Sequence, residues 1–188
     1  MSYELKSARF LARDALLRAV RPGDTVVDAT MGNGHDTLFL AEQVGTEGHV
    51  YAFDIQESAV ESTRQLLEEH GVSGRVTLLC RSHAEMAGAV PSGLAAAVFN
   101  LGWLPGGDHS ITTLCASTEK AVLSALDLLK RGGIVTVCAY PGHEEGNREL
   151  EMLAGLLSGL SNRIYNVLRQ TFLNAGQGAP ECFIIQKL

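Results

Sequence analysis

Two stretches of this sequence, and one carboxylate between them, have residue types and spacing suited to chemistry. Residues 26–37, VVDATMGNGHDT, run from an apolar segment through a glycine turn into a helix start, and Asp54 closes the next apolar segment. The second stretch is residues 100–108, NLGWLPGGD. Glycines let a backbone approach a ligand, a helix N-terminus offers free N–H groups, and the carboxylate can accept both hydroxyls of a ribose. The first stretch and Asp54 therefore predict a nucleoside-cofactor site at the carboxyl edge of a parallel sheet.

The elements that must position these residues alternate along the chain. An amphipathic first helix is expected to stop at Arg21-Pro22-Gly23. Continuous apolar runs then predict strands at residues 25–29, 49–53, 76–80, 94–99 and 133–139. Helices are predicted between them at residues 36–43, 57–69 and 117–129, each ending in a glycine-containing turn. Because the strands are apolar throughout, helices should cover both faces of the sheet.

The C-terminal part predicts a helix at residues 147–160 and two more strands at 165–172 and 182–186. The loop between these strands is too short for a crossover helix, so the two strands should be antiparallel. Five parallel strands closed by an antiparallel hairpin form an α/β sheet. With no linker, repeat or low-complexity segment, residues 1–188 are expected to form a single domain.

The composition fits an ordinary globular protein. The chain has 188 residues, 46% hydrophobic and 19% charged, which is enough for one core. No apolar run approaches the ~20 residues that span a bilayer, and no signal-peptide pattern is present, so we expect a cytoplasmic protein. The cysteines form no C-x-x-C pair, and we expect reduced, mostly buried thiols and no zinc site at Cys80, Cys115, Cys138 and Cys182.

The charge pattern gives two alternatives for the first helix. A net charge of −6 argues against sequence-blind binding to nucleic acid. Lys6, Arg9 and Arg13 nevertheless recur at three- and four-residue spacing, which places them on one helix face. A solvated face is the simpler interpretation. A face that contacts phosphate is the alternative.

The glycine turn narrows the choice of cofactor. A dinucleotide site has the pattern G-x-G-x-x-G/A, whereas Gly32 and Gly34 are followed by Thr37 at the third position. The chain also has too few strands for a second mononucleotide half. The pattern therefore favours S-adenosylmethionine, which carries a single nucleoside, over NAD.

Four segments together resemble the YtqB/MnmM family, whose members were long labelled putative rRNA methylases. The segments are residues 28–37, Asp54/Gln56, Ser82-His83 and, most specifically, residues 100–108. The resemblance covers about Val26 to the C-terminus. It implies a Rossmann-like class I methyltransferase fold with a mostly parallel seven-stranded sheet, of order 3-2-1-4-5-7-6, whose last strand is antiparallel. It also implies S-adenosylmethionine as the methyl donor. The implied acceptor is the aminomethyl group of 5-aminomethyl-2-thiouridine at the tRNA wobble position.

Expected cofactor contacts come from these segments. Asp28 and Asp36 are carboxylates that would stabilise a cationic sulfonium, although Asp36 is also suited to cap a helix. Asp54 is the expected ribose acceptor, and Ser82 would either contact adenine or cap a short helix at residues 84–89. The full expected set is Asp28, Gly32, Asn33, Gly34, His35, Asp36, Asp54, Gln56, Ser82, His83 and Asn100. The resemblance supports Asn33 and His35, the latter being otherwise a plain loop histidine. Thr30 departs from the general class I pattern, which has glycine there.

Residues 100–108 are expected to form the reaction loop. Amino-methylating class I enzymes carry an Asn/Asp-Pro-Pro-aromatic tetrapeptide here, whose side-chain oxygen accepts a hydrogen bond from the target amine. This chain keeps Asn100 and Trp103 at that spacing but has Leu101-Gly102 between them. Trp103 would either stack on the uracil ring, a contact of about 1–3 kcal/mol, or lie in the core. Candidates for accepting the proton that the amine releases are Asp108, His109 and Tyr140.

A tRNA substrate gives weight to a set of basic residues, Lys6, Arg9, Arg13, Lys130, Arg131 and Arg163. A wobble base lies in the single-stranded anticodon loop, so presenting it costs less than flipping a base from a duplex. Several alternatives stay open: an rRNA or a small-molecule amine as acceptor, a cofactor-binding protein without enzymatic activity, and a nicotinamide-linked dehydrogenase. A homodimer is compatible with the sequence.

Overall fold

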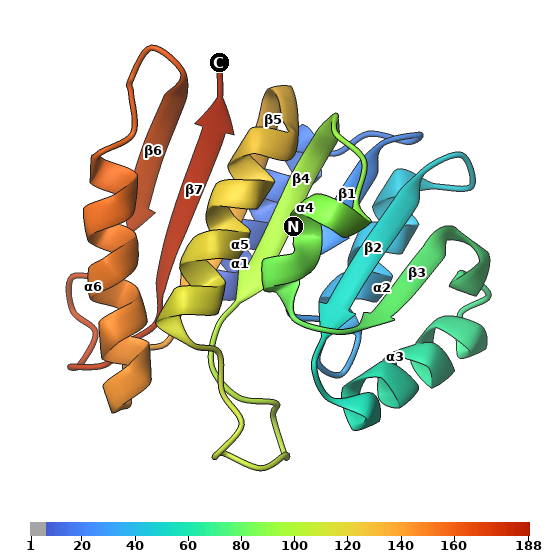
Figure 1. Ribbon diagram of the computed structural model, residues 1–188, viewed down its shortest axis with the longest axis horizontal. Coiled ribbons are helices and arrows are strands. Elements are labelled where there is room, and N and C mark those ends of the chain that lie inside the picture. The colour runs from blue at the N-terminus through green and yellow to red at the C-terminus, as the bar shows by residue number, and fades with distance from the viewer. Residues whose placement is uncertain (1–6) are drawn as a thin grey trace.

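The computed structural model describes residues 7–188 and contains one seven-stranded sheet flanked by helices (Figure 1). The strands are β1 Thr25–Asp28, β2 His49–Asp54, β3 Val76–Cys80, β4 Leu94–Asn100, β5 Leu129–Ala139, β6 Tyr165–Gln170 and β7 Glu181–Lys187. The helices are α1 Ala8–Ala19, α2 His35–Val44, α3 Glu57–Glu69, α4 Met86–Ala89, α5 Cys115–Leu128 and α6 Glu144–Ser158. Two 3₁₀ helices, η1 Ser73–Arg75 and η2 His83–Glu85, precede β3 and α4.

The order of the strands is β3-β2-β1-β4-β5-β7-β6. β7 is antiparallel to both of its neighbours, and the pairs from β3 to β5 are parallel. The structure thus confirms the predicted strand order and the antiparallel hairpin formed by β6 and β7. Within residues 7–188, no helix has the length and apolar character needed to cross a membrane.

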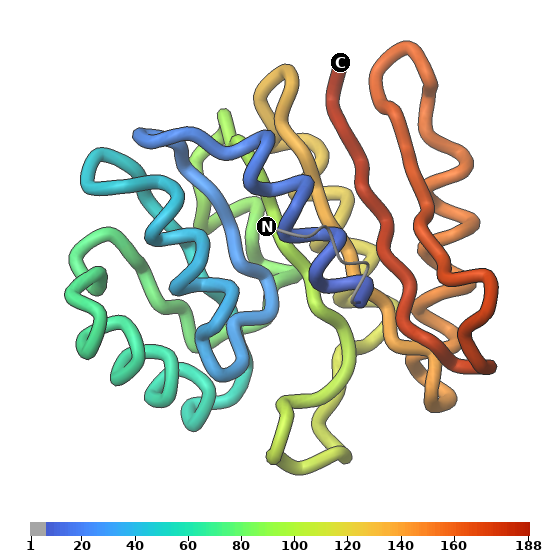
Figure 2. The backbone as a smooth tube through the Cα atoms, turned by 180° about the vertical axis from the view of Figure 1, so that it is seen from behind, coloured from blue at the N-terminus to red at the C-terminus, as the bar shows by residue number. Residues whose placement is uncertain are grey.

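Helices cover both faces of the sheet. α4, α5 and α6 lie on the face toward the viewer in Figure 1, and α1 and α2 lie on the opposite face, which Figure 2 shows from behind. On the first face Phe99 and Leu153 belong to one buried cluster. On the second, Leu16 of α1, Leu40 of α2 and Leu67 of α3 belong to another. The continuous apolar run of β4 is buried between these layers, as expected of a central parallel strand.

The carboxyl ends of β1, β2 and β4 meet at one edge of the sheet. Asp28 at the end of β1 pairs with Ala52 on one side and Val98 on the other. Each neighbouring strand continues two residues further, so β2 ends on Asp54 and β4 ends on Asn100. The loop of residues 101–114 leaves β4 at this edge and projects from the bottom of the molecule in Figure 1. All the segments singled out for chemistry therefore converge here.

The predicted turn at Gly132-Gly133 is wrong. α5 ends at Leu128 and β5 follows without a loop, so the glycines lie inside the strand. The pairing of β4 with β5 shifts between Leu94 and Ala96, and Gly132 takes a φ of 79°. A left-handed backbone conformation favours glycine in turns and at irregular positions of a strand alike. The Gly132-Gly133 pair therefore predicts a turn although it lies in a strand.

α6 begins at Glu144, three residues before the predicted start at residue 147. His143 caps the helix, because its Nδ1 accepts a hydrogen bond from the Gly146 N–H at 3.2 Å. Histidine is an unusual cap, and no Ser, Thr, Asp or Asn marks the start of this helix in the sequence.

The expectation of mostly buried thiols holds for two of the four cysteines. Cys138 and Cys182 are buried and directly opposite each other on β5 and β7. Cys115 is half-buried at the start of α5, and Cys80 is exposed at the end of β3. Cys80 ends an edge strand, which only one neighbour covers.

Candidate active site

The turn between β1 and α2 is held in a conformation that needs glycine. Gly32 and Gly34 have φ values of 50° and 82°. Gly34 is the N-cap of α2 and makes no side-chain cap hydrogen bond, so the alternative of Asp36 as the cap is wrong. A Cβ on Gly34 would lie 2.9 Å from Thr63 Oγ1 on α3. The Thr63 hydroxyl donates to the Gly32 carbonyl at 3.0 Å, which fixes the turn against α3.

We therefore expect Gly34→Ala to lower the free energy of unfolding by about 2–5 kcal/mol. A left-handed alanine costs about 1–2 kcal/mol, and the contact with Thr63 adds about 1–3 kcal/mol of overpacking. Gly71→Ala is the matched control, because Gly71 also has a positive φ of 65° but nothing lies within 4 Å of its Cβ position. Urea unfolding of both variants measures the difference. Equal losses would show that the close approach to α3 has no energetic weight.

Asp54 links the glycine turn to the start of α3. Its Oδ2 accepts a hydrogen bond from the Gly32 N–H and its Oδ1 accepts one from the Gln56 N–H, both at 3.0 Å. The side chain is only half-buried, so its oxygens remain within reach of a ligand at the sheet edge. Ile55, the next residue, is 58% exposed and offers apolar surface for a base. We did not single out Ile55 from the sequence, although an apolar residue after a strand-ending carboxylate was the available signal.

Ser82 and His83 connect the end of β3 to the same edge. The Ser82 hydroxyl accepts a hydrogen bond from the Ala84 N–H at 3.2 Å, which is the capping role named as the alternative. His83 is buried, and its Nδ1 lies 3.0 Å from the Ala29 carbonyl. Because a carbonyl only accepts, Nδ1 carries the proton. Burial lowers the pKa of His83, so the ring is neutral and ties this segment to the glycine turn.

Asp28 lies beneath the turn rather than on its ligand-facing surface. Its side chain is fully buried and accepts hydrogen bonds from the Thr37 hydroxyl at 2.7 Å and the Thr30 N–H at 3.2 Å. Asp28 was expected as a nearby carboxylate that stabilises a cationic sulfonium, and its burial means that it could do so only through the turn and not by direct contact. The structure also accounts for Thr30, because the Thr30 hydroxyl accepts the backbone N–H of Asn100 at 2.8 Å, a bond that glycine cannot make.

Burial, with the charge of Asp36 adding to it, raises the pKa of Asp28 from 3.8 to about 7. A carboxyl whose pKa is raised on folding stabilises the protein below its unfolded value, and this contribution is lost as pH rises through its folded value. We expect the unfolding free energy of the wild type to fall between pH 4 and pH 7 by up to ~4 kcal/mol from this group.

Asp28→Asn should remove that dependence, because an amide does not titrate. Asparagine can keep both contacts, since its oxygen can accept the Thr30 N–H and its amino group can donate to the Thr37 hydroxyl. Urea unfolding across this pH range, compared between the wild type and the variant, measures the effect. Parallel stability profiles would contradict it.

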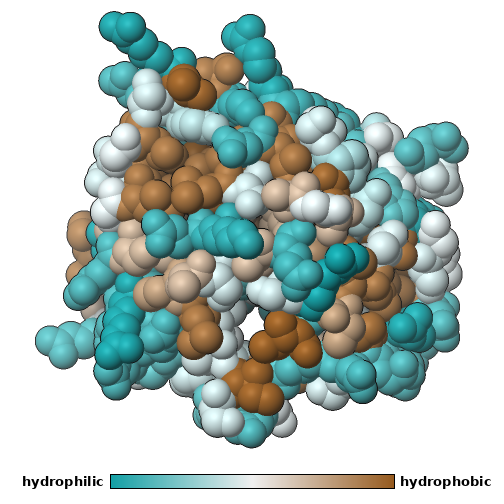
Figure 3. Space-filling view, in the orientation of Figure 1, coloured by the Kyte–Doolittle hydropathy of each residue, from teal (hydrophilic) through white to brown (hydrophobic). Residues whose placement is uncertain are grey.

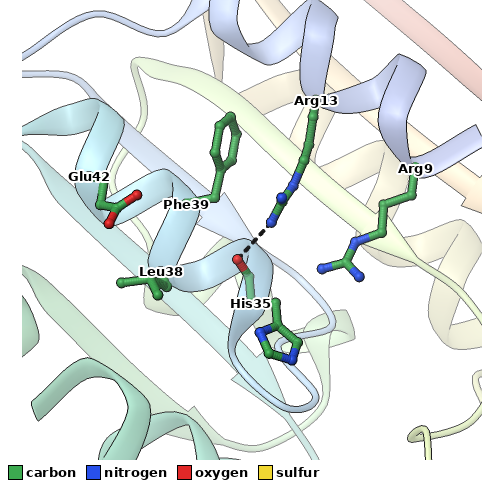
Figure 4. Close-up of a pocket in the computed structure, with 6 residues that line it drawn as sticks. All are labelled: Arg9, Arg13, His35, Leu38, Phe39 and Glu42. Carbon is green, nitrogen blue, oxygen red and sulfur yellow. Dashed lines mark hydrogen bonds between the residues drawn. The ribbon is translucent and has the colours of Figure 1, made fainter. Parts of the chain in front are cut away.

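Asp36 holds the N-terminal helix against the site. Its Oδ2 is 2.8 Å from Arg9 Nε, and its Oδ1 is 2.8 Å from both Arg13 Nε and Arg13 Nη2. Arg13 also donates to the His35 carbonyl at 2.8 Å, as Figure 4 shows. Beside these arginines lies an open hollow of about 340 Å³, lined by Arg9, Arg13, His35, Leu38, Phe39 and Glu42. Both arginines are thus engaged inside the molecule, and Lys6 lies outside the described residues.

Asn100 joins this network from the end of β4. Its Nδ2 donates to Asp36 Oδ2 at 2.7 Å. Its Oδ1 is buried and has no hydrogen-bond partner among residues 7–188. An unpaired buried acceptor is costly in a folded protein, which makes Asn100 Oδ1 a candidate contact for a ligand at this edge.

The loop of residues 101–114 is fastened at its base from α6. The Gly102 N–H donates to Thr113 Oγ1, whose hydroxyl donates to Glu149 at 2.8 Å. Glu149 is buried and also accepts from Thr118 on α5 at 2.6 Å. The Asn33 amide donates to the Pro105 carbonyl at 3.2 Å, which joins the loop to the glycine turn. Sequence reasoning missed Glu149, which stands among the other acidic residues of an amphipathic helix.

Trp103 lies on the surface of this loop, so the alternative of a core tryptophan is wrong. Its ring stacks on His109, with 4.4 Å between centroids and 17° between planes, and it also contacts His143. Figure 3 shows apolar atoms on the projecting loop, where Ile111 and Leu114 are exposed as well. The loop therefore presents aromatic and apolar surface beside the sheet edge.

The structure distinguishes among the predicted proton acceptors. Burial raises the pKa of Tyr140 to about 12, so its phenol stays protonated at neutral pH and is a poor base. Asp108 is exposed, and hydrogen bonds from Ser110 lower its pKa, which also weakens it as a base. His109 lies against Trp103 and is exposed.

Known proteins are similar to this chain over most of its length. A family model described as putative rRNA methylase matches residues 50–186. The Arabidopsis thaliana chloroplastic tRNA (mnm(5)s(2)U34)-methyltransferase is 41% identical over 165 residues, which cover 82% of this chain and 60% of that protein. The present chain thus spans less than two thirds of this curated relative.

Two solved structures are similar over nearly the whole chain. A putative rRNA-methylase from Clostridium thermocellum has a TM-score of 0.97 at 39% identity, with 99% of this chain and 100% of the other covered. A putative methyltransferase from Streptococcus mutans, solved in complex with SAH, has a TM-score of 0.90 at 32% identity, with 98% and 100% covered. Because the family model matches most of the chain and a fully covered solved structure is 39% identical, the chain, which has the class I methyltransferase fold, belongs to the putative rRNA methylase family.

Proposed function

We propose that this protein is an S-adenosylmethionine-dependent N-methyltransferase that methylates the aminomethyl group of 5-aminomethyl-2-thiouridine at the wobble position of tRNA. The observation that carries the proposal is the buried, unpartnered Oδ1 of Asn100 at the edge where the glycine turn and Asp54 meet. The name of the 41% identical plant protein supports this particular acceptor.

The residues at the sheet edge fit the cofactor. The left-handed glycines leave the turn free of side chains, and a Cβ on Gly32 would meet Leu104 at 3.4 Å. Asp54 and the segment after it would hold the ribose and the base, with Ile55 as an apolar contact. When bound, S-adenosylmethionine supplies a methyl group made electrophilic by its sulfonium. Asp36, neutralised by two arginines, is not a free carboxylate for that charge.

Asn100 would orient the acceptor. Its Oδ1 would accept one N–H of the neutral amine and so direct the nitrogen lone pair toward the methyl carbon. The N–C bond forms as the S–C bond breaks, and the resulting ammonium then gives up a proton. Neither Tyr140 nor Asp108 is a strong base here, so the proton would pass to His109 on the loop or to water.

A single-stranded substrate reconciles RNA binding with the net charge of −6. Recognition of one unpaired base can be local, through the aromatic and apolar surface of the 101–114 loop. Trp103 would stack on the uracil ring only by displacing His109 or by extending that stack.

Methyl transfer assays would test the proposal directly. The protein, with radiolabelled S-adenosylmethionine, would be given tRNA that carries the aminomethyl group, the same tRNA as an unmodified transcript, and rRNA. We expect transfer to the modified tRNA alone. Transfer to the transcript or to rRNA would overturn the proposed acceptor. An unchanged amount of methylaminomethyl-thiouridine in tRNA from a deletion strain would overturn it as well. Calorimetric binding of NAD but not of S-adenosylhomocysteine would overturn the cofactor as well.

A further inference from the structure

We propose that Arg9 and Arg13 of α1 are positioning residues for Asn100 and act through Asp36. The two guanidiniums converge on one carboxylate, which in turn holds the amide of Asn100. This inference rests on the proposed function, in which Asn100 Oδ1 receives the acceptor amine. It gives the N-terminal helix a role in the reaction itself.

The contacts of Asp36 fix which end of the amide faces it. Both of its oxygens accept hydrogen bonds from guanidinium N–H groups, Oδ2 from Arg9 and Oδ1 from Arg13. The amide of Asn100 must therefore turn its Nδ2 toward Asp36, because the opposite orientation would bring two acceptors to 2.7 Å. Oδ1 is consequently directed away from Asp36 as the free acceptor.

The arrangement is rigid on both sides. Ala8, Ala12 and Leu16 are buried, so the arginine-bearing helix is packed onto the sheet. The Arg13 guanidinium lies over the Phe39 ring, 4.7 Å from its centroid, in addition to its bonds with Asp36 and His35. The backbone of Asn100 is held by the Thr30 hydroxyl. With the backbone held, the hydrogen bond to Asp36 orients the side-chain amide of Asn100.

The competing interpretation is that these arginines neutralise RNA phosphates. The side chains of Arg9 and Arg13 are 40% and 35% exposed. Each guanidinium nevertheless points to Asp36, whose side chain is only 8% exposed. Glu42 also lines the hollow beside them, which disfavours a polyanion. The two interpretations predict different kinetics, since phosphate contacts govern RNA affinity and its salt dependence.

The test compares Arg9→Met, Arg13→Met and the double variant with Arg18→Met. Arg18 is on the same helix but, among residues 7–188, pairs only with Asp14 at the surface, so its loss removes one charge without touching the site. We expect the double variant to lower kcat by about 10- to 100-fold, because a misplaced acceptor group reacts slowly. KM for tRNA and its salt dependence should match those of Arg18→Met. In an Asn100→Ala background, the same substitutions should cause no further loss.

A second readout does not depend on activity. The side-chain amide resonance of Asn100, identified by its loss in Asn100→Ala, should shift in the arginine variants of the cofactor-free protein and not in Arg18→Met. If the methionine variants do not fold, Arg9→Lys and Arg13→Lys are measured in their place, because lysine keeps the positive charge. A raised KM with unchanged kcat, or an unshifted amide resonance, would overturn the inference. If the wild type methylates no RNA, the proposed function fails, while the resonance still tests the link from Arg9 and Arg13 to Asn100.

Discussion

Asn100→Ala should lower kcat by about 100-fold or more while the protein still folds and binds S-adenosylhomocysteine. The substitution removes a buried acceptor at the sheet edge that has no partner among the described residues, and with it the group that would orient the amine. The backbone N–H of residue 100 keeps its bond to Thr30, so the end of β4 stays in place. Single-turnover methyl transfer, together with calorimetry of S-adenosylhomocysteine, separates the two effects.

Two further variants sharpen this prediction. Asn100→Asp would bring a second carboxylate against Asp36, so it should be no more active than alanine at neutral pH. Asn147→Ala on α6 is the control, because that asparagine is exposed and lies outside the site. Wild-type turnover in Asn100→Ala would contradict the role of the amide and would leave the reaction loop without a positioning group.

Much of the fold was predictable because it depends on local pattern. Continuous apolar runs predict buried parallel strands, and the short loop before β7 predicts the antiparallel hairpin. Asp54 was also predictable, because a carboxylate that ends a buried strand must reach the sheet edge. These predictions depend only on the order of residues that are close together in the sequence.

The internal links of the site were not predictable in the same way. Arg9 and Asp36 are 27 residues apart, and Thr30 and Asn100 are 70 apart. The spacing of Arg9 and Arg13 places them on one helix face, but it does not say which element that face contacts. Thr30 therefore looked like an unexplained departure, and the arginines looked like a solvated or RNA-contacting face.

The three carboxylates of the site have separate tasks, which their surroundings determine. Asp28 is buried beneath the turn and accepts hydrogen bonds from the Thr30 N–H and the Thr37 hydroxyl. Asp36 is ion-paired and holds Asn100. Asp54 alone is half-exposed, so it is the carboxylate whose loss should affect cofactor binding most directly.

Asp54→Ala should weaken the binding of S-adenosylhomocysteine by about 100-fold or more. Hydrogen bonds to a charged group contribute about 1.5–3 kcal/mol each, and two ribose hydroxyls lost together correspond to at least ~3 kcal/mol, or a factor of about 100. The Gly32 and Gln56 N–H groups also lose their acceptor, which loosens the turn. Calorimetry measures the affinity, and thermal unfolding shows whether the protein remains folded.

Asp54→Asn and Glu57→Ala make the prediction specific. Asparagine keeps one acceptor oxygen, so it should retain part of the affinity that alanine loses. Glu57 is an exposed carboxylate in the first turn of α3, three residues away, and its loss should leave affinity unchanged if direct contact rather than general charge is responsible. Equal weakening in Asp54→Ala and Glu57→Ala would point to the electrostatic field of the α3 N-terminus. Because Asp54 accepts hydrogen bonds from the turn and from α3 at once, the contact interpretation requires that only Asp54 variants lose affinity.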